Sequence, residues 1–223
     1  LRYHYRAGGA QGVGYQPIVA GGANAFHGHY SLNDCELGNG DLVLVDCAPD
    51  YRYYTSDITR MWPVNGKYSP AQRALYGFVV EYHKTLLRGI RPGRMLAEIE
   101  AEAAEAMGRR IGEFRFATAA HESGARAMFA FRGHLSHSVG LCVHDPGGHA
   151  SRPLEPGMVF APDPQMRIPE ERLYIRCEDT GVVTETGFDV FTGDMPLEMD
   201  DMESLMRGDG LLQRFPPVAA PPV

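Results

Sequence analysis

The feature that most constrains this chain is a set of short apolar runs, each ended by a carboxylate. The run from Asp41 to Asp46 is apolar between its two acids, which is typical of a buried strand. Asp57 lies eleven residues after Asp46, in a stretch of Tyr, Thr and Ile (51–61) that we interpret as the partner strand. A turn at Pro49 would place the two acids side by side. Like charges this close are costly unless a cation lies between them, although solvation or pairing with arginine is an alternative.

Two further acids repeat this pattern later in the chain. Asp163 follows an apolar run that starts at Gly157, and Glu178 follows the sequence Tyr-Ile-Arg-Cys. Four such acids and one histidine, His137, form an oxygen-rich set with a single imidazole. This set suits a pair of divalent ions such as Mn, Co or Zn better than one structural zinc, which prefers Cys and His. The alternative for Asp163 is a turn residue before Pro164.

Three histidines, His134, His137 and His144, lie within eleven residues of one another. His137 and His144 are seven residues apart, with an apolar, glycine-containing stretch between them that we interpret as a strand. Odd spacing on a strand places two side chains on opposite faces unless a bulge intervenes, so we expect different roles for these two. Histidines that belong to the core are the alternative.

Helical patterns occupy the middle of the chain. Ser69, Pro70 and Gln72 form a strong helix start, with a cap, a proline at the first position and a capping box. Apolar residues then recur at helical spacing, and a second helical stripe begins at Leu96. With strands on both sides, the pattern predicts an α+β fold with helices over one face of a mainly antiparallel sheet. We expect one domain over residues 1–207 and a Pro-rich C-terminal tail over 208–223.

The composition argues against nucleic acid and membrane as partners. The 223 residues are 44% hydrophobic, enough to bury a real core. Acidic residues outnumber basic ones by 28 to 21 and no Lys/Arg run occurs, so we expect no nucleic-acid binding. No stretch reaches the roughly 18 apolar residues of a membrane span.

The four cysteines form no CxxC pair. We therefore expect buried free thiols in a reducing compartment and a cytoplasmic location. The chain begins at Leu1 rather than Met, so a targeting signal on an upstream segment is an alternative.

Several motifs, in this order, resemble those of the pita-bread metallopeptidases, in particular the Xaa-Pro aminopeptidase and prolidase branch. The resemblance covers roughly residues 12 to 190. It rests on Ile18 to Ala25, Gly28 to Tyr30, Gly40 to Asp46, Tyr54 to Arg60, Pro63 to Gly66, His134 to Asp145, Leu154 to Val159, Arg176 to Asp179 and Val183 to Gly187.

The resemblance implies a pita-bread fold, with a curved, mainly antiparallel sheet and helices on its outer face. It also implies a ligand set for two divalent ions, with Mn preferred over Co or Zn. Asp57 and Glu178 would bridge the ions, Asp46 would chelate one ion, and His137 would bind the other. Asp163 occupies the place of a glutamate that binds metal and shuttles a proton.

The remaining matched positions imply contacts with the substrate. His29 and His144 match histidines that hold the scissile carbonyl and stabilise its tetrahedral intermediate. His134 and Arg176 match second-layer or substrate-contact positions. The implied reaction is hydrolysis of Xaa-Pro bonds in short proline-containing peptides by a hydroxide that bridges the metals.

Two features depart from the family's pattern. Asp163 is one methylene shorter than the family's glutamate, and a misplacement near 1 Å can cost on the order of 100-fold in rate. Only residues 1–16 precede the first long strand, so we expect the family's two N-terminal helices to be missing or truncated here, and the alternative is that the sequence is a fragment. An uncovered apolar patch would then be covered by a second copy, forming a homo-oligomer, or by another partner.

Alternative functions stay open. A catalytically impaired or inactive protein of this fold could act as a binding module. A non-peptidase hydrolase of the creatine-cleaving type works without metals, so the complete acid set counts against it. Methionine aminopeptidases share the acid set, but the stretch from His134 to Asp145 fits the proline-directed branch better.

Overall fold

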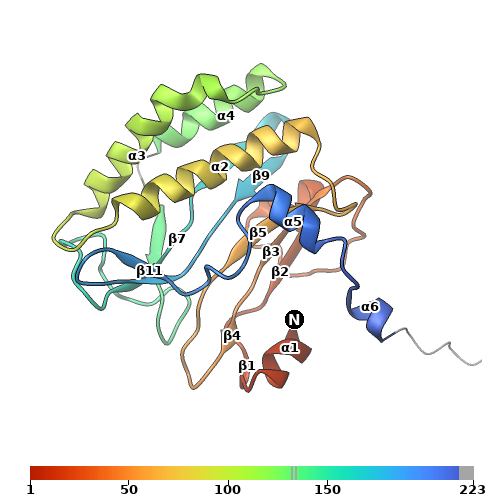
Figure 1. The fold of residues 1–223 in the computed structure, drawn as a ribbon, viewed down its shortest axis with the longest axis horizontal. Helices are drawn as coiled ribbons and strands as arrows, with labels where there is room; N and C mark the ends of the chain where they lie inside the picture. Colours follow the sequence, from red (N-terminus) through yellow and green to blue (C-terminus); the bar gives the residue numbers. More distant parts are fainter. Residues whose placement is uncertain (132, 134, 216–223) are drawn as a thin grey trace, which may run out of the picture.

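Helices cover one side of a set of antiparallel strands in the computed structural model, which describes residues 1–131, 133 and 135–215. Figure 1 shows α2, α3 and α4 as a layer above the strands, with α5 beside the start of α2 and near β5, and α6 further to the right. The helices are α1 (Arg2–Ala7), α2 (Pro70–Gly89), α3 (Leu96–Arg110), α4 (Ala119–Ala130), α5 (Met199–Leu205) and α6 (Leu211–Arg214).

The strands pair antiparallel throughout the described residues and fall into separate sheets. One sheet has the order β2-β3-β5, another has the order β11-β10-β7-β6, and β1-β4 and β8-β9 form two-stranded ribbons. The bounds are β1 (Gly12–Val13), β2 (Ile18–Gly21), β3 (Leu42–Asp46), β4 (Pro49–Asp50), β5 (Thr59–Pro63), β6 (Ser136–Ser138), β7 (Val159–Pro162), β8 (Gln165–Ile168), β9 (Leu173–Arg176), β10 (Gly181–Val183) and β11 (Phe188–Val190).

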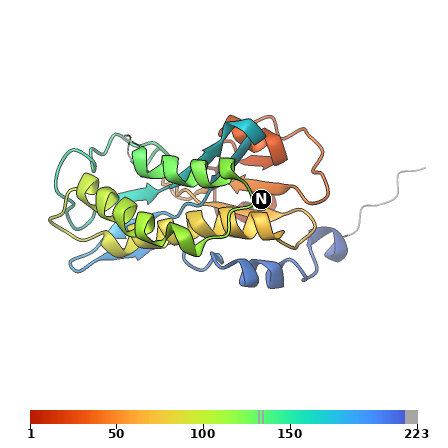
Figure 2. The same ribbon diagram turned by 90° about the horizontal axis from the view of Figure 1, so that it is seen from above.

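The longest helix begins where its sequence signal predicts. The Ser69 side chain accepts a hydrogen bond from the backbone N–H of Gln72, and the Gln72 side chain accepts one from the backbone N–H of Ser69, so the capping box is complete. The helix buries an apolar stripe that includes Phe78, Val79 and Leu86. Seen from above, α2 and α3 run alongside each other over the strands (Figure 2). The predicted α+β arrangement is therefore present.

The β2-β3-β5 sheet fixes where the first acid lies. Asp46 is the last residue of β3, and in register it faces Ile18 on one side and Thr59 on the other. A short backbone bridge between Thr59 and Glu178 then connects β5 to the residue that follows Cys177. This bridge brings together chain segments that are more than a hundred residues apart.

Three local expectations differ from the structure. The predicted strand over 51–61 forms only from Thr59 onward, because Arg52 and Tyr53 adopt positive φ angles of 53° and 71° that turn the chain. The strand expected between His137 and His144 ends at Ser138. Helix α4 was not predicted, because its buried face uses a histidine, a glycine and an alanine besides a methionine and so lacks a clear apolar stripe.

Cysteine placement is also only partly as expected. All four cysteines are free, but Cys35 and Cys142 are exposed, whereas Cys47 and Cys177 are buried. Burial raises the pKa of the Cys47 and Cys177 thiols. No helix in the described part of the chain has the length and apolar character that a membrane crossing requires.

Candidate metal centre

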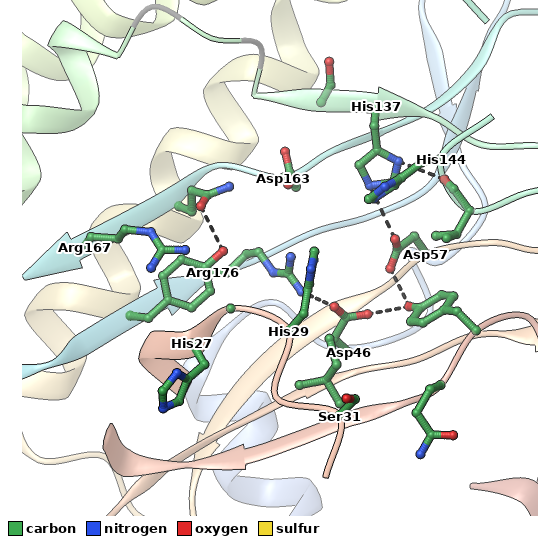
Figure 3. Close-up of a pocket in the computed structure, with 18 residues that line it drawn as sticks. His27, His29, Ser31, Asp46, Asp57, His137, His144, Asp163, Arg167 and Arg176 are labelled. Carbon is green, nitrogen blue, oxygen red and sulfur yellow. Dashed lines mark hydrogen bonds and ion pairs between the residues drawn. The ribbon is translucent and has the colours of Figure 1, made fainter. Parts of the chain in front are cut away.

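Acidic side chains from separate strands meet at one pocket of about 600 Å³. Asp46 ends β3, Asp57 lies two residues before β5, and Asp163 directly follows β7. All three line the pocket, together with His137 from β6 (Figure 3). Because each acid sits at a strand end, the carboxylates reach the pocket while the strands behind them stay apolar.

Three of the predicted ligands form a group of the size that a metal ion needs. One ligand atom each from Asp57, His137 and Glu178 lies within 4.8 Å of the other two. The Nε2 atom of His137 is 3.0 Å from Oε1 of Glu178 and 3.4 Å from Oδ2 of Asp57. The Nδ1 atom of His137 lies 3.0 Å from the backbone carbonyl of Val143, which fixes the ring with Nε2 turned toward the acids.

A tyrosine that the sequence analysis did not single out joins the two aspartates. The hydroxyl of Tyr15 lies 2.6 Å from Oδ1 of Asp57 and also contacts Oδ1 of Asp46. Burial, followed by the charges of Asp57 and Asp46, raises the pKa of Tyr15, so the phenol keeps its proton and donates it. Nothing in the glycine-rich stretch around Tyr15 signals this contact, which depends on residues 31 and 42 positions away.

Arg176 provides the positive charge in the middle of the site. Its Nη2 contacts Oδ2 of Asp46, and its Nε lies 3.8 Å from Oε2 of Glu178. The Arg176 side chain is buried, and its Nε has no hydrogen-bond partner among the described residues. Arg176 therefore neutralises part of the negative charge of the acidic group, and the remaining carboxylates need another positive group.

The electrostatics indicate that the site is short of positive charge. Burial, followed by the charge of Glu178, raises the pKa of Asp57 to about 7. Burial alone would lower the pKa of His137, but its contacts with Asp57 and Glu178 raise it to about 11. A histidine that holds its proton this strongly substitutes for a cation between the two carboxylates.

The pKa and burial of Asp163 also indicate that the site is short of positive charge. Burial, followed by the charge of Glu178, raises its pKa well above the ordinary value. Its side chain is 9% exposed, and among the described residues no hydrogen-bond donor or ion-pair partner reaches its carboxylate. Asp163 lines the pocket, and a carboxylate with so little exposure beside the charge of Glu178 is costly in free energy unless a cation pairs with it. The residues present therefore fit a divalent cation, which would pair with Asp163 and replace the proton on His137.

The remaining predicted histidines lie on the open side of the pocket. His29 and His144 line it, with ring centroids 6.3 Å apart, and the His144 ring lies 4.3 Å from that of His137. His137 and His144 line the same pocket despite their odd spacing, because the strand ends at Ser138 and the chain turns before His144, while their expected difference in role stays a prediction. Burial, followed by the charges of His137 and His29, lowers the pKa of His144. His134 lies outside the described residues.

A buried network holds Glu178 from behind. Thr59 Oγ1 donates to Oε2 of Glu178 at 2.8 Å. Arg60 Nη1 donates to the Glu178 carbonyl at 2.6 Å, and its Nη2 pairs with Asp179 Oδ1 at 2.7 Å. His83 Nε2 lies 2.8 Å from the other Asp179 oxygen. The motif that contains Asp57 also contains Thr59 and Arg60, but their partners, more than a hundred residues away, are not evident from it.

Comparison with known proteins gives consistent matches. A model of metallopeptidase family M24 matches residues 1–185. The Xaa-Pro aminopeptidase of Escherichia coli K12 is 36% identical, over 92% of this chain and 50% of that protein. The mitochondrial intermediate cleaving peptidase 55 of Arabidopsis thaliana is 33% identical, over 92% of this chain and 43% of that protein.

Solved structures agree with the sequence matches. Proline aminopeptidase P II from Yersinia pestis has a TM-score of 0.80 and 36% identity, over 92% of this chain and 51% of that one. This similarity confirms the predicted α+β, pita-bread arrangement. The chain spans about half the length of the curated relatives it matches.

Proposed function

Because this chain belongs to metallopeptidase family M24, we propose that it is a metal-dependent exopeptidase that hydrolyses Xaa-Pro bonds in short peptides. One observation carries the proposal: Asp57, His137 and Glu178 offer ligand atoms within 4.8 Å of one another. Asp46 and Asp163 line the same pocket and supply two further carboxylates. This donor set, rich in oxygen with one imidazole, suits two divalent ions, for which Mn is our first candidate and Co or Zn the alternatives.

The chain's own residues suit peptide hydrolysis. When bound, the divalent ions supply Lewis acidity and make water easier to deprotonate. His144 and His29 are placed on the open side of the pocket, where a neutral imidazole N–H can donate a hydrogen bond to the carbonyl oxygen as it gains charge. The lowered pKa of His144 favours the neutral ring. Asp163 can take a proton from the attacking water and pass it to the proline nitrogen, which leaves only when protonated.

A second function is favoured by one feature of the site. Asp163 lies outside the compact group of Asp57, His137 and Glu178, and its side chain is short. If its carboxylate reaches the ion but misplaces the proton, the protein would bind metal and peptide with little turnover. A binding module is therefore the second candidate. The two candidate functions differ in one property of the chain, namely whether the Asp163 carboxylate can transfer the proton.

The Asp163→Glu variant separates these candidates. We would measure bound metal by atomic emission, and cleavage of Ala-Pro and Ala-Pro-Ala, for the wild-type protein and the variant. Two bound ions and turnover that rises about tenfold or more in the variant are expected for an enzyme impaired by the short acid. The control is Glu155→Asp, which changes an exposed acid outside the pocket and should leave turnover unchanged. Bound ions with no cleavage in either protein would favour the binding module, and absence of bound ions would contradict both candidates.

A further inference from the structure

An arginine on β8 lies at the end of the pocket away from the ligand group. Residues of β8 alternate, so that Met166 and Ile168 enter the core while Gln165 and Arg167 line the pocket. Figure 3 shows Arg167 at one side of the view, with Asp57 and His137 at the other. The pocket therefore has an acidic end and a separate cationic end.

The Arg167 side chain is held in place. Its guanidinium lies over the Tyr174 ring at 4.3 Å from the centroid and over the Phe26 ring at 5.5 Å. Its Nη1 donates to the carbonyl of Phe26 at 2.9 Å. A Cβ atom at Gly28 would lie 3.3 Å from Nη2, so the glycine leaves room for the guanidinium. A guanidinium fixed by stacking loses little freedom when it binds a ligand.

Arg167 differs from the other arginine of the pocket in its charge balance. Arg176 is buried and paired with Asp46, whereas Arg167 is exposed, and no carboxylate in the described part of the chain pairs with it. A guanidinium has five N–H donors, and the contact with Phe26 uses one of them. The free donors match the fork of a carboxylate, which is the geometry that arginine recognises best. The ligand at this end should therefore be an anion.

The length of the pocket indicates which anion fits. Asp163 and Arg167 are four residues apart, which is at most about 13 Å at the rise of a strand, so a ligand that reaches from one to the other is of that order in length. One peptide residue beyond the scissile carbonyl and a hydrogen bond span about 6.5 Å, whereas two residues and a hydrogen bond span about 10 Å. In a peptide cut after its first residue, the ammonium group stays near the acidic end. The carboxylate of a tripeptide therefore reaches Arg167, but that of a dipeptide does not.

We propose that Arg167 binds the C-terminal carboxylate of an Xaa-Pro-Yaa tripeptide and makes this length the preferred substrate. The inference rests on the proposed function in one respect, that the scissile bond lies at the acidic end. Arg167 would be a specificity-determining residue, because it contacts a part of the peptide that does not react. Its contribution should therefore appear in KM rather than in kcat.

Kinetics with matched peptides test this assignment. Ala-Pro-Ala, its C-terminal amide and Ala-Pro would be assayed with the wild-type protein and with Arg167→Met, which removes the charge but keeps an apolar stem. We expect kcat/KM for the tripeptide acid to fall about 10- to 100-fold, as for a lost charged hydrogen bond, with most of the change in KM. The tripeptide amide and Ala-Pro should change less than about twofold, because neither presents a carboxylate to Arg167. Arg126→Met, an exposed arginine on α4, is the control.

Equilibrium binding distinguishes failure of this inference from failure of the proposed function. Calorimetry on the metal-free protein would compare Ala-Pro-Ala with its amide, before and after the Arg167→Met change. A preference for the acid of about tenfold, lost in the variant, supports the carboxylate site even if no peptide is cleaved. An equal loss for acid and amide, no loss at all, or no binding of either peptide would overturn it. A strong effect on Ala-Pro would overturn the assigned length.

Discussion

Replacement of Arg60 by methionine tests whether the network behind Glu178 holds the fold together. Arg60 is 2% exposed and donates five hydrogen bonds. One of them pairs it with Asp179, and another reaches the carbonyl of Glu178. Methionine fills much of the same volume but provides no charge and no donor. Within the described part of the chain, the variant therefore leaves Asp179 as a buried carboxylate with His83 and Thr192 as its remaining side-chain partners.

The expected loss of stability follows from the buried charge of Asp179, which the variant no longer pairs with an arginine. Burial raises the pKa of Asp179, and the hydrogen bond from His83 and the charge of Arg60 more than reverse the effect, so the pKa is lowered in the wild-type protein. Removal of one partner from a buried pair costs about 3–5 kcal/mol, because the other charge stays buried and loses its ion-pair partner. For a chain of this size, each kcal/mol shifts Tm by about 2–4 °C, which gives a decrease of roughly 6–20 °C.

Urea unfolding of the metal-free protein, followed by circular dichroism, measures this loss. The matched control is Arg73→Met, since Arg73 is 36% exposed and its pairs with Asp200 and Glu203 should be worth about 0–1 kcal/mol. The double variant Arg60→Met, Asp179→Leu should recover part of the loss, because it removes both charges. An Arg60→Met protein within about 1 kcal/mol of the wild type would refute this account of the network.

Three other outcomes are expected. Asp57→Ala should lose at least one bound ion, as measured by atomic emission after dialysis, and retention of two ions would count heavily against the assigned ligands. Thr59→Val removes the hydroxyl that donates to a buried carboxylate, and should weaken metal binding by about 1.5–3 kcal/mol, measured by competition with a chromophoric chelator; an unchanged affinity would contradict this role. In the native protein an aromatic disulfide reagent should modify Cys35 and Cys142 within minutes and the other two thiols only after unfolding, whereas rapid reaction of all four would contradict the described burial.

The elements that could be predicted from the sequence are those whose pattern lies within one short stretch of the chain. The capping box at Ser69 predicted the start of α2, and the apolar run before Asp46 predicted β3. The acids at strand ends were visible for the same reason, because a carboxylate after a buried run needs compensation. The short distance between Asp57 and Glu178 is a consequence of the bridge at Thr59, which no local pattern encodes.

The parts that were missed depend on contacts between distant segments. Tyr15 contacts both aspartates because it lies between β1, which pairs with β4, and β2, whose Ile18 pairs with Asp46 of β3. The His144 ring lies near His137 because of a turn that a strand-like sequence conceals. Arg167 is exposed and would ordinarily be assigned to the surface, and its place in the pocket follows from the pairing of β8 with β9. Such contacts require the tertiary structure.

The bridge between Thr59 and Glu178 has a consequence for the order of folding. It closes a loop of 119 residues. Such long-range contacts form late, because the chain loses entropy when the loop closes and gains compensating contacts only afterwards. During synthesis, Asp46 and Asp57 leave the ribosome long before Glu178 does. The candidate ligand set that contains Asp57 and Glu178 is therefore complete only after the segment that carries Glu178 has been translated.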